Sequence, residues 1–235
     1  MSQVTNPIQA CSEIFFKPNG VFAALNVKHN WSWIPFILVI TATILPAYVY
    51  FNFVDFEWYR EIFINANYGD ISPNEQENYR NSMTIDTILM FTIVGTIVGS
   101  LFINAILAVY FNLVTKSDEQ NTNGFTDWFG FTWWIAMPGI ISAMIALIVV
   151  ALATNHQLDP VSLSPTSAAF LFNVSMESEW FGWAQGVRIE TFWTIYLAAV
   201  GISQWTGIRG NKTYIIAAIP YFLLWGIWGL ITAMS

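Results

Sequence analysis

Long uncharged runs of apolar residues dominate the chain, and their length limits what it can fold into. The clearest run is WSWIPFILVITATILPAYVYFNF, from Trp31 to Phe53, which has no charged side chain. A helix needs about 20 mostly apolar residues to cross a bilayer. Only 10% of the 235 residues are charged, whereas roughly 25% is usual for a soluble domain. The sequence therefore predicts an all-α polytopic membrane protein rather than a soluble protein with a large core.

Five segments have the length and composition of membrane-spanning helices, which predicts a bundle of about five transmembrane helices. The predicted spans are residues 31–53, 84–114, 128–154, 190–208 and 213–233. Pro46 lies inside the first span and Pro138 in the first half of the third. The predicted organisation is an N-terminal cytoplasmic segment, residues 1–30, followed by one five-helix membrane domain, residues 31–235.

The basic residues predict the orientation, because cytoplasmic loops of membrane proteins have an excess of Lys and Arg. A cytoplasmic N-terminus and an outer C-terminus leave five basic side chains inside and three outside. The inner ones are Lys17, Lys28, Lys116, Arg209 and Lys212, and the outer ones are Arg60, Arg80 and Arg188. Most of the acidic residues then lie outside. We therefore predict that the N-terminus is inside and that the first span acts as the targeting signal.

Two long outer loops follow from this topology, residues 54–83 and 155–189. In the first loop, Ser72-Pro73 followed by acidic residues predicts the start of a helix, which we expect to continue directly into the second span. The second loop contains an apolar patch, residues 168–174, and an aromatic run, residues 179–183. Both are too short to cross a bilayer, so they should lie at the outer interface or pack over the bundle.

The N-terminal segment from Pro7 to Leu25 allows two interpretations. Its apolar residues include Ile8, Ile14 and Phe22, and Pro18 interrupts them. The segment could form a short, broken amphipathic helix along the inner membrane surface. The alternative is a loosely ordered tail, and the sequence leaves both open.

The sequence contains no HExxH, GxSxG, P-loop or CxxC motif, and Cys11 is its single cysteine. His29 and His156 fall on opposite sides of the membrane in the predicted topology, so they cannot share a metal ion. No titratable residue lies at a span centre, which argues against a proton-coupled transporter. We expect no enzymatic activity, no cofactor, no metal and no nucleic-acid partner.

The second span has the most informative internal pattern, four polar residues that recur every four positions and therefore share one helix face. With the two glycines that flank them, the residues of this face are Thr92, Gly95, Thr96, Gly99, Ser100 and Asn104. Small residues let helix backbones approach closely, and hydroxyls and amides can bond across helices. The face could pack within the bundle, associate with a second copy, or line a polar solute path. Asn104 should point inward, because an amide facing lipid is costly.

The order of these segments resembles the Yip1 domain family of small polytopic membrane proteins. The resemblance rests on the opening NPIQACSEIFFKPNGVFAAL, the Trp-rich entry to the first span, the loop ISPNEQENYRNSM, Pro138, and the ending LAAVGISQWTGIRGNKTYIIAAIPY. The compact form is similar to prokaryotic members, which implies the inner (plasma) membrane of a bacterium. The family implies a non-enzymatic scaffold that organises the membrane or partner proteins. Its expected partners are the lipid bilayer and either a second copy or another membrane protein. A channel or carrier for a small solute or lipid is the alternative.

Overall fold

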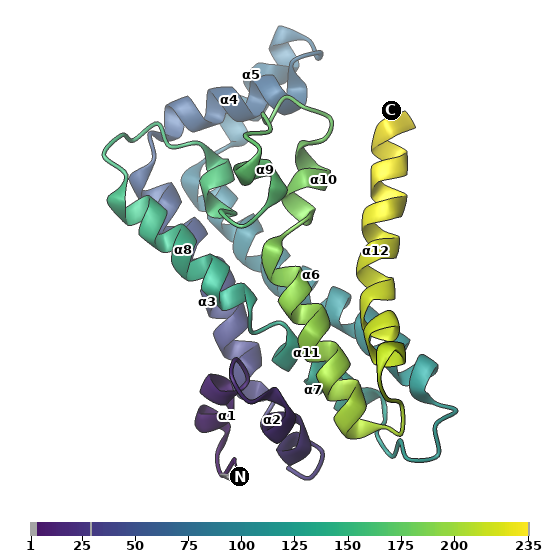
Figure 1. Ribbon diagram of the computed structural model, residues 1–235. Coiled ribbons are helices and arrows are strands. Elements are labelled where there is room, and N and C mark those ends of the chain that lie inside the picture. The colour runs from purple at the N-terminus through teal and green to yellow at the C-terminus, as the bar shows by residue number, and fades with distance from the viewer. Residues whose placement is uncertain (1–3, 29, 235) are drawn as a thin grey trace. The chain divides into compact units, whose positions relative to one another are not determined.

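The computed structural model describes residues 4–28 and 30–234, and the regular elements in these ranges are helices (Figure 1). Within these ranges, four stretches are long and apolar enough to cross a membrane, by length and composition. They are α3 (Trp33–Phe53), α6 (Ile85–Thr115), the stretch Phe125–Leu152, and α12 (Asn211–Met234). A fifth helix, α11 (Ile189–Trp205), has 17 residues and is shorter than these four stretches. The predicted all-helical architecture is confirmed.

The chain forms two compact units, which are described separately. Unit 1 contains residues 1–41, 98–140 and 190–224, and unit 2 contains residues 42–97, 141–189 and 225–235. Helices α3, α6 and α12 each contribute residues to both units.

The N-terminal segment forms two short helices in unit 1, α1 (Pro7–Glu13) and α2 (Pro18–Leu25). Pro18 begins α2, and the side chain of Asn6 caps α1 by accepting from Gln9 N. The side chain of Phe22 is fully buried, and its carbonyl oxygen accepts a 2.9 Å hydrogen bond from Trp205 Nε1. The apolar side of this broken helical segment packs into the core of unit 1, and its position along the inner membrane surface stays a prediction.

The third predicted span consists of two helices, α7 (Phe125–Ile135) and α8 (Gly139–Leu152). Pro138 lies between them and has no N–H to continue the hydrogen-bond ladder. At the other end of α7, the carboxylate of Asp127 accepts a 2.9 Å hydrogen bond from Gly124 N. This bond caps the start of the helix. This helix supplies half of the buried aromatic residues in the core of unit 1, namely Trp128, Phe131 and Trp134.

Pro220 lies inside α12, and its missing N–H leaves the carbonyl of Ile216, four residues earlier, without its usual helical donor. The hydroxyl of Tyr110 on α6 donates to that oxygen at 2.9 Å. A membrane interior offers no water to bond a freed carbonyl. Tyr110 therefore compensates for the proline within unit 1.

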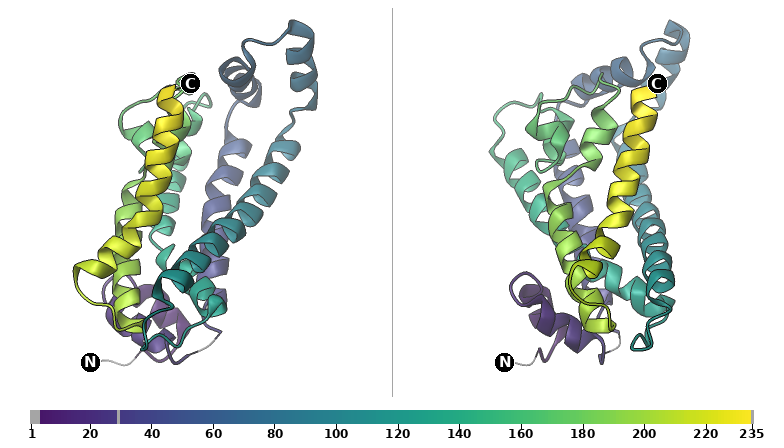
Figure 2. Two further views of the ribbon diagram at one scale, coloured as in Figure 1. Left: turned by 90° about the vertical axis from the view of Figure 1, so that its right-hand side faces the viewer. Right: turned by 45° about the vertical axis from the view of Figure 1, so that its right-hand side comes forward.

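The loop predicted at residues 54–83 forms a helical hairpin in unit 2, α4 (Phe56–Tyr68) and α5 (Pro73–Ser82) (Figure 2). Ser72 and Glu75 form the capping box of α5, so the predicted helix start is confirmed. The prediction that this helix runs into the second span is wrong. Met83 is extended, with ψ of 98°, and a new helix start follows, where Thr84 Oγ1 accepts from Thr87 N at 3.2 Å.

The loop predicted at residues 155–189 folds into three short elements of unit 2, the 3-10 helix η1 (Pro160–Leu163), α9 (Ala168–Leu171) and α10 (Phe181–Gly186). Thus the apolar patch and the aromatic run both become helical. Two tryptophans connect α10 to the last part of α12. Trp183 Nε1 donates to Trp225 O at 2.9 Å, and Trp225 Nε1 donates to Gly186 O at 3.1 Å. The aromatic run therefore packs against another helix of unit 2.

Candidate functional site

The face predicted from the second span lies on α6, and its two glycines are exposed. A Cβ atom added at Gly95 or Gly99 would meet no atom of the described residues within 4 Å, apart from the helix's own backbone and chain neighbours. Around them, α6 exposes large apolar side chains, namely Phe91, Val94, Val98, Phe102 and Ile106. In the most apolar 18 residues of α6, only 11% of the residues are buried within the protein. The corresponding share in the stretch Phe125–Leu152 is 39%. Two glycines and several aliphatic side chains are thus available to an outside surface.

The polar residues of the face have different surroundings. Asn104 is buried, and its Nδ2 donates to Ser100 O in the same helix at 2.8 Å. Thr92 lines a cavity of about 520 Å³ in unit 2, together with residues of α4 and α5 such as Tyr59 and Tyr79. The backbone of α6 therefore accepts one hydrogen bond from the Asn104 amide. Thr92, in contrast, faces an apolar space lined by aromatic side chains.

Three titratable groups outside the predicted spans, Cys11, Tyr59 and Glu61, have pKa values shifted by burial or by a neighbouring arginine. Burial raises the pKa of the Cys11 thiol to about 11, so it is protonated and a poor nucleophile at neutral pH. Burial likewise raises the pKa of Tyr59 to about 12. The guanidinium of Arg80 makes two hydrogen bonds to Glu61, at 2.9 and 3.1 Å. These bonds hold the pKa of Glu61 below its ordinary value and join α5 to α4.

His156 has two backbone contacts at the end of α3. His156 Nδ1 lies 2.6 Å from Phe53 O, and His156 O accepts from Asp55 N at 2.8 Å. These contacts fix the loop after α8 against the end of α3 within unit 2. His29 lies outside the described residues. Among the residues that are described, no group of three or more His, Cys, Asp or Glu side chains could hold a metal ion.

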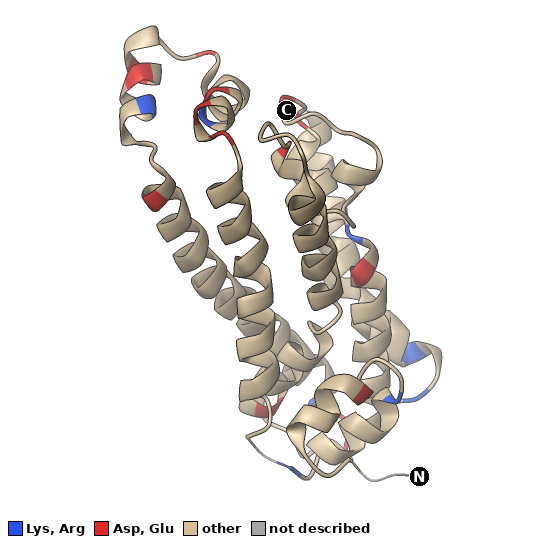
Figure 3. Ribbon diagram, turned by 90° about the vertical axis from the view of Figure 1, so that its left-hand side faces the viewer, with Lys and Arg blue, Asp and Glu red and all other residues tan. Residues whose placement is uncertain are grey.

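Charge is distributed unequally between the two units. Unit 2 contains ten acidic and three basic residues, whereas unit 1 contains five of each. Figure 3 shows these residues in loops and near helix ends, with the middle of the long helices uncoloured. Long uncharged helices with charged ends are typical of membrane spans.

Together these features define an all-helical integral membrane protein whose residues suggest packing roles rather than chemistry. A family model described as the Yip1 domain matches residues 12–233. The chain therefore belongs to the Yip1 domain family, whose members are non-enzymatic membrane-trafficking factors. The chain is accordingly a non-enzymatic membrane protein. Neither a curated protein nor a solved structure matches it.

Sequence reasoning missed the contacts made by the aromatic run at residues 179–183. It identified residues 179–183 as a short aromatic segment but gave Trp183 no partner. The signal available in the sequence was a repeated pairing of small and aromatic residues, Gly182 and Gly186 in one segment and Trp225 and Trp228 in the other. In unit 2, a Cβ on Gly186 would lie 3.0 Å from the Trp228 ring, so the glycines admit the tryptophan.

Proposed function

We propose that this protein is a membrane scaffold, and that the accessible part of the α6 face, around Gly95, Thr96 and Gly99, binds the same part of a second copy. The observation that supports the proposal is the open space above Gly95 and Gly99, together with the exposed aliphatic side chains beside them. Between helices in lipid there is little hydrophobic driving force, so close packing and interhelical hydrogen bonds favour association. Glycines one turn apart let two helix backbones approach closely enough for tight packing and for interhelical hydrogen bonds.

A second copy fits this face because the face can be self-complementary. In a twofold dimer the same patch is used on both subunits. Two glycine faces can approach until their backbones touch, whereas a bulky partner side chain would lose that contact. Thr96 lies beside the glycines and is half-buried, so its hydroxyl can bond across the contact. Assembly through α6 leaves the rest of the chain available to organise other membrane proteins.

The same proposal includes the organisation and orientation predicted from the sequence. Residues 1–30 form a cytoplasmic segment, residues 31–235 form the membrane domain, and the C-terminus is outside, in the inner membrane of a bacterium. The higher share of acidic residues in unit 2 supports this, although Lys and Arg carry most of the weight. The pairing of Asn104 within its own helix gives no support to the alternative of a solute path.

Energy transfer between two labelled populations in lipid vesicles tests the proposal. Gly95→Leu and Gly99→Leu should each weaken association by about tenfold, which corresponds to ~1.4 kcal/mol. Gly226→Leu is the matched control, because Gly226 is also an exposed helical glycine with open space above it, but on α12. Equal association of all three variants and the parent would overturn the proposed face, as would a parent protein that is monomeric in vesicles.

A further inference from the structure

A cavity of about 500 Å³ lies within unit 1, formed by the end of α2, the start of α3, and parts of α6, α7 and α11. Aromatic side chains form most of its apolar wall. Trp33 and Phe36 meet edge to face at 5.7 Å, Phe36 and Trp133 at 4.8 Å, and Phe129 and Trp133 at 5.9 Å, measured between ring centroids. The cavity is thus large enough for part of a small molecule and is lined by π-systems that attract cations.

Two opposite charges, Lys28 and Asp127, line the same cavity. Within the described chain, Lys28 and Asp127 form no ion pair with each other. One oxygen of Asp127 accepts from Gly124 N, and its second oxygen can still accept another donor. A ligand with one negative and one positive group could contact both side chains.

The polar and apolar parts of the lining are adjacent. Asn30, Ser32 and Thr126 line the cavity with the two charges, and Ser32 Oγ already accepts from Trp134 Nε1 at 3.2 Å. On the apolar side, Leu101 of α6 lines the cavity, and the exposed Trp33 continues its surface along α3. Tryptophan favours the membrane–water interface, where lipid headgroups lie. The lining thus suits a molecule with a charged head and a hydrocarbon chain.

We infer that this cavity binds the headgroup of one zwitterionic phospholipid with a primary ammonium. Its phosphate contacts Lys28, and its ammonium donates to Asp127 and lies against the aromatic wall. One acyl chain follows Leu101 and Trp33 into the bilayer. A quaternary ammonium would keep the aromatic attraction but cannot donate a hydrogen bond to the carboxylate. An anionic glycerol headgroup would lack the cation that Asp127 requires.

Native mass spectrometry of the purified full-length protein in detergent tests this inference, with phosphatidylethanolamine, phosphatidylcholine and phosphatidylglycerol added separately. The first lipid should bind about fivefold more tightly than the other two, as expected for one charge-assisted hydrogen bond. Water-soluble glycerophosphoethanolamine has the same headgroup without chains and should bind much more weakly than the lipid. Equal binding of the three lipids, or equal binding of the soluble headgroup, would overturn the inference.

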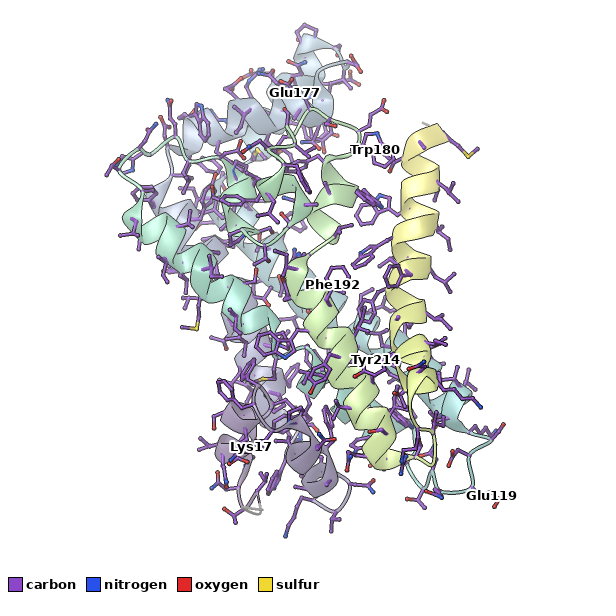
Figure 4. The ribbon with its side chains drawn as sticks, viewed as in Figure 1. Lys17, Glu119, Glu177, Trp180, Phe192 and Tyr214 are labelled. Atoms are coloured by element: carbon purple, nitrogen blue, oxygen red, sulfur yellow. The ribbon has the colours of Figure 1, made fainter. Side chains whose placement is uncertain are left out.

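Two pairs of variants locate the site. Lys28→Gln should lower the affinity for phosphatidylethanolamine about fivefold, whereas Lys17→Gln, at the turn between α1 and α2 (Figure 4), should not. Thr126→Trp should fill the cavity and abolish preferential binding, whereas Phe125→Trp changes a neighbour that does not line it. Unchanged lipid preference in both Lys28→Gln and Thr126→Trp would overturn the inference. Neither pair touches the glycines of α6, so the dimer proposal is tested separately.

Discussion

Trp183 and Trp225 each donate an indole N–H to a backbone carbonyl of the helix that holds the other. Trp183 Nε1 lies 2.9 Å from Trp225 O, and Trp225 Nε1 lies 3.1 Å from Gly186 O at the end of α10. The carbonyl of Gly186 is at a helix end, where no intrahelical N–H remains to bond it. The two tryptophans therefore hold a short loop helix against a long one within unit 2.

Replacing Trp183 by Phe should destabilise this contact. The ring volume is largely kept, but the hydrogen bond to Trp225 O is lost, which typically costs about 1 kcal/mol. We expect a lower thermal midpoint in detergent, measured by circular dichroism. Trp180→Phe is the control, because Trp180 is more exposed and its ring only flanks Trp183, with centroids 5.6 Å apart. A midpoint lowered equally by both changes would contradict the role of the bond.

Gly201 of α11 should tolerate no side chain. A Cβ there would collide with the ring of Phe131 and lie 3.0 Å from Phe22 Cδ1. Overpacking a filled core costs typically 1–3 kcal/mol, which should exceed the gain of about 1 kcal/mol that alanine offers in a helix. Gly201→Ala should therefore lower the thermal midpoint, whereas Gly226→Ala, with open space around it, should leave it unchanged or raise it. The opposite order would show that α11 and α7 pack less closely.

Tyr110 and Pro220 should be energetically coupled. Tyr110→Phe removes the donor to Ile216 O, at an expected cost of roughly 1 kcal/mol. Pro220→Ala restores the helical N–H, so the same Tyr110→Phe change should then cost much less. A double-mutant cycle on thermal or denaturant unfolding in detergent measures this coupling. Additive effects of the two substitutions would mean that Tyr110 does not compensate for the proline.

The ion pair between Arg80 and Glu61 should make the α4–α5 hairpin sensitive to acid. The pKa of Glu61 is lowered below its ordinary value of 4.5, chiefly by the hydrogen bonds from Arg80. A lowered folded-state pKa gives a stabilising contribution that is present above the unfolded-state pKa and is lost as pH falls through the folded-state pKa. Because both side chains are partly exposed to solvent, we expect a small effect on stability.

Nuclear magnetic resonance titration of a labelled Glu61 carboxyl tests this prediction directly. Arg80→Gln should raise the pKa of Glu61 toward 4.5, while Arg60→Gln should change it less, because Arg60 contributes the weakest of the lowering effects. A larger pKa shift from Arg60→Gln than from Arg80→Gln would mean that Arg60, and not Arg80, is the main partner of Glu61.

The sequence predicted most of the long helices because spans are uniform apolar runs that need no knowledge of their partners. It also predicted the start of α5, since Ser72 and Glu75 form a capping signal that is local. The sequence did not predict two features that depend on tertiary contacts. The first is the break at Met83, which separates two segments that each favour a helix. The second is α4, whose residues, FEWYREIFINANY, are too polar to be recognised as a membrane span.

The two candidate sites also differ in whether they depend on local sequence patterns or on tertiary contacts. The α6 face could be predicted because Gly95, Gly99 and the polar residues beside them recur at helical spacing. The cavity in unit 1 could not, because Lys28 and Asp127 are about a hundred residues apart in sequence. Only folding of α2, α3 and α7 around one space brings their charges to the same lining.

Cysteine cross-linking along α6 tests the proposed dimer most directly. Cys11 is the single cysteine, so a Cys11→Ala chain provides a background in which one cysteine at a time can be introduced at position 95, 97 or 99. After oxidation in native membranes, Gly95→Cys and Gly99→Cys should form disulfide-linked dimers rapidly, because the two backbones are in contact there. Ile97→Cys, which lies on the opposite side of the helix from the glycines, should react slowly. No cross-linking at positions 95 and 99, or equal cross-linking at all three positions, would contradict the account.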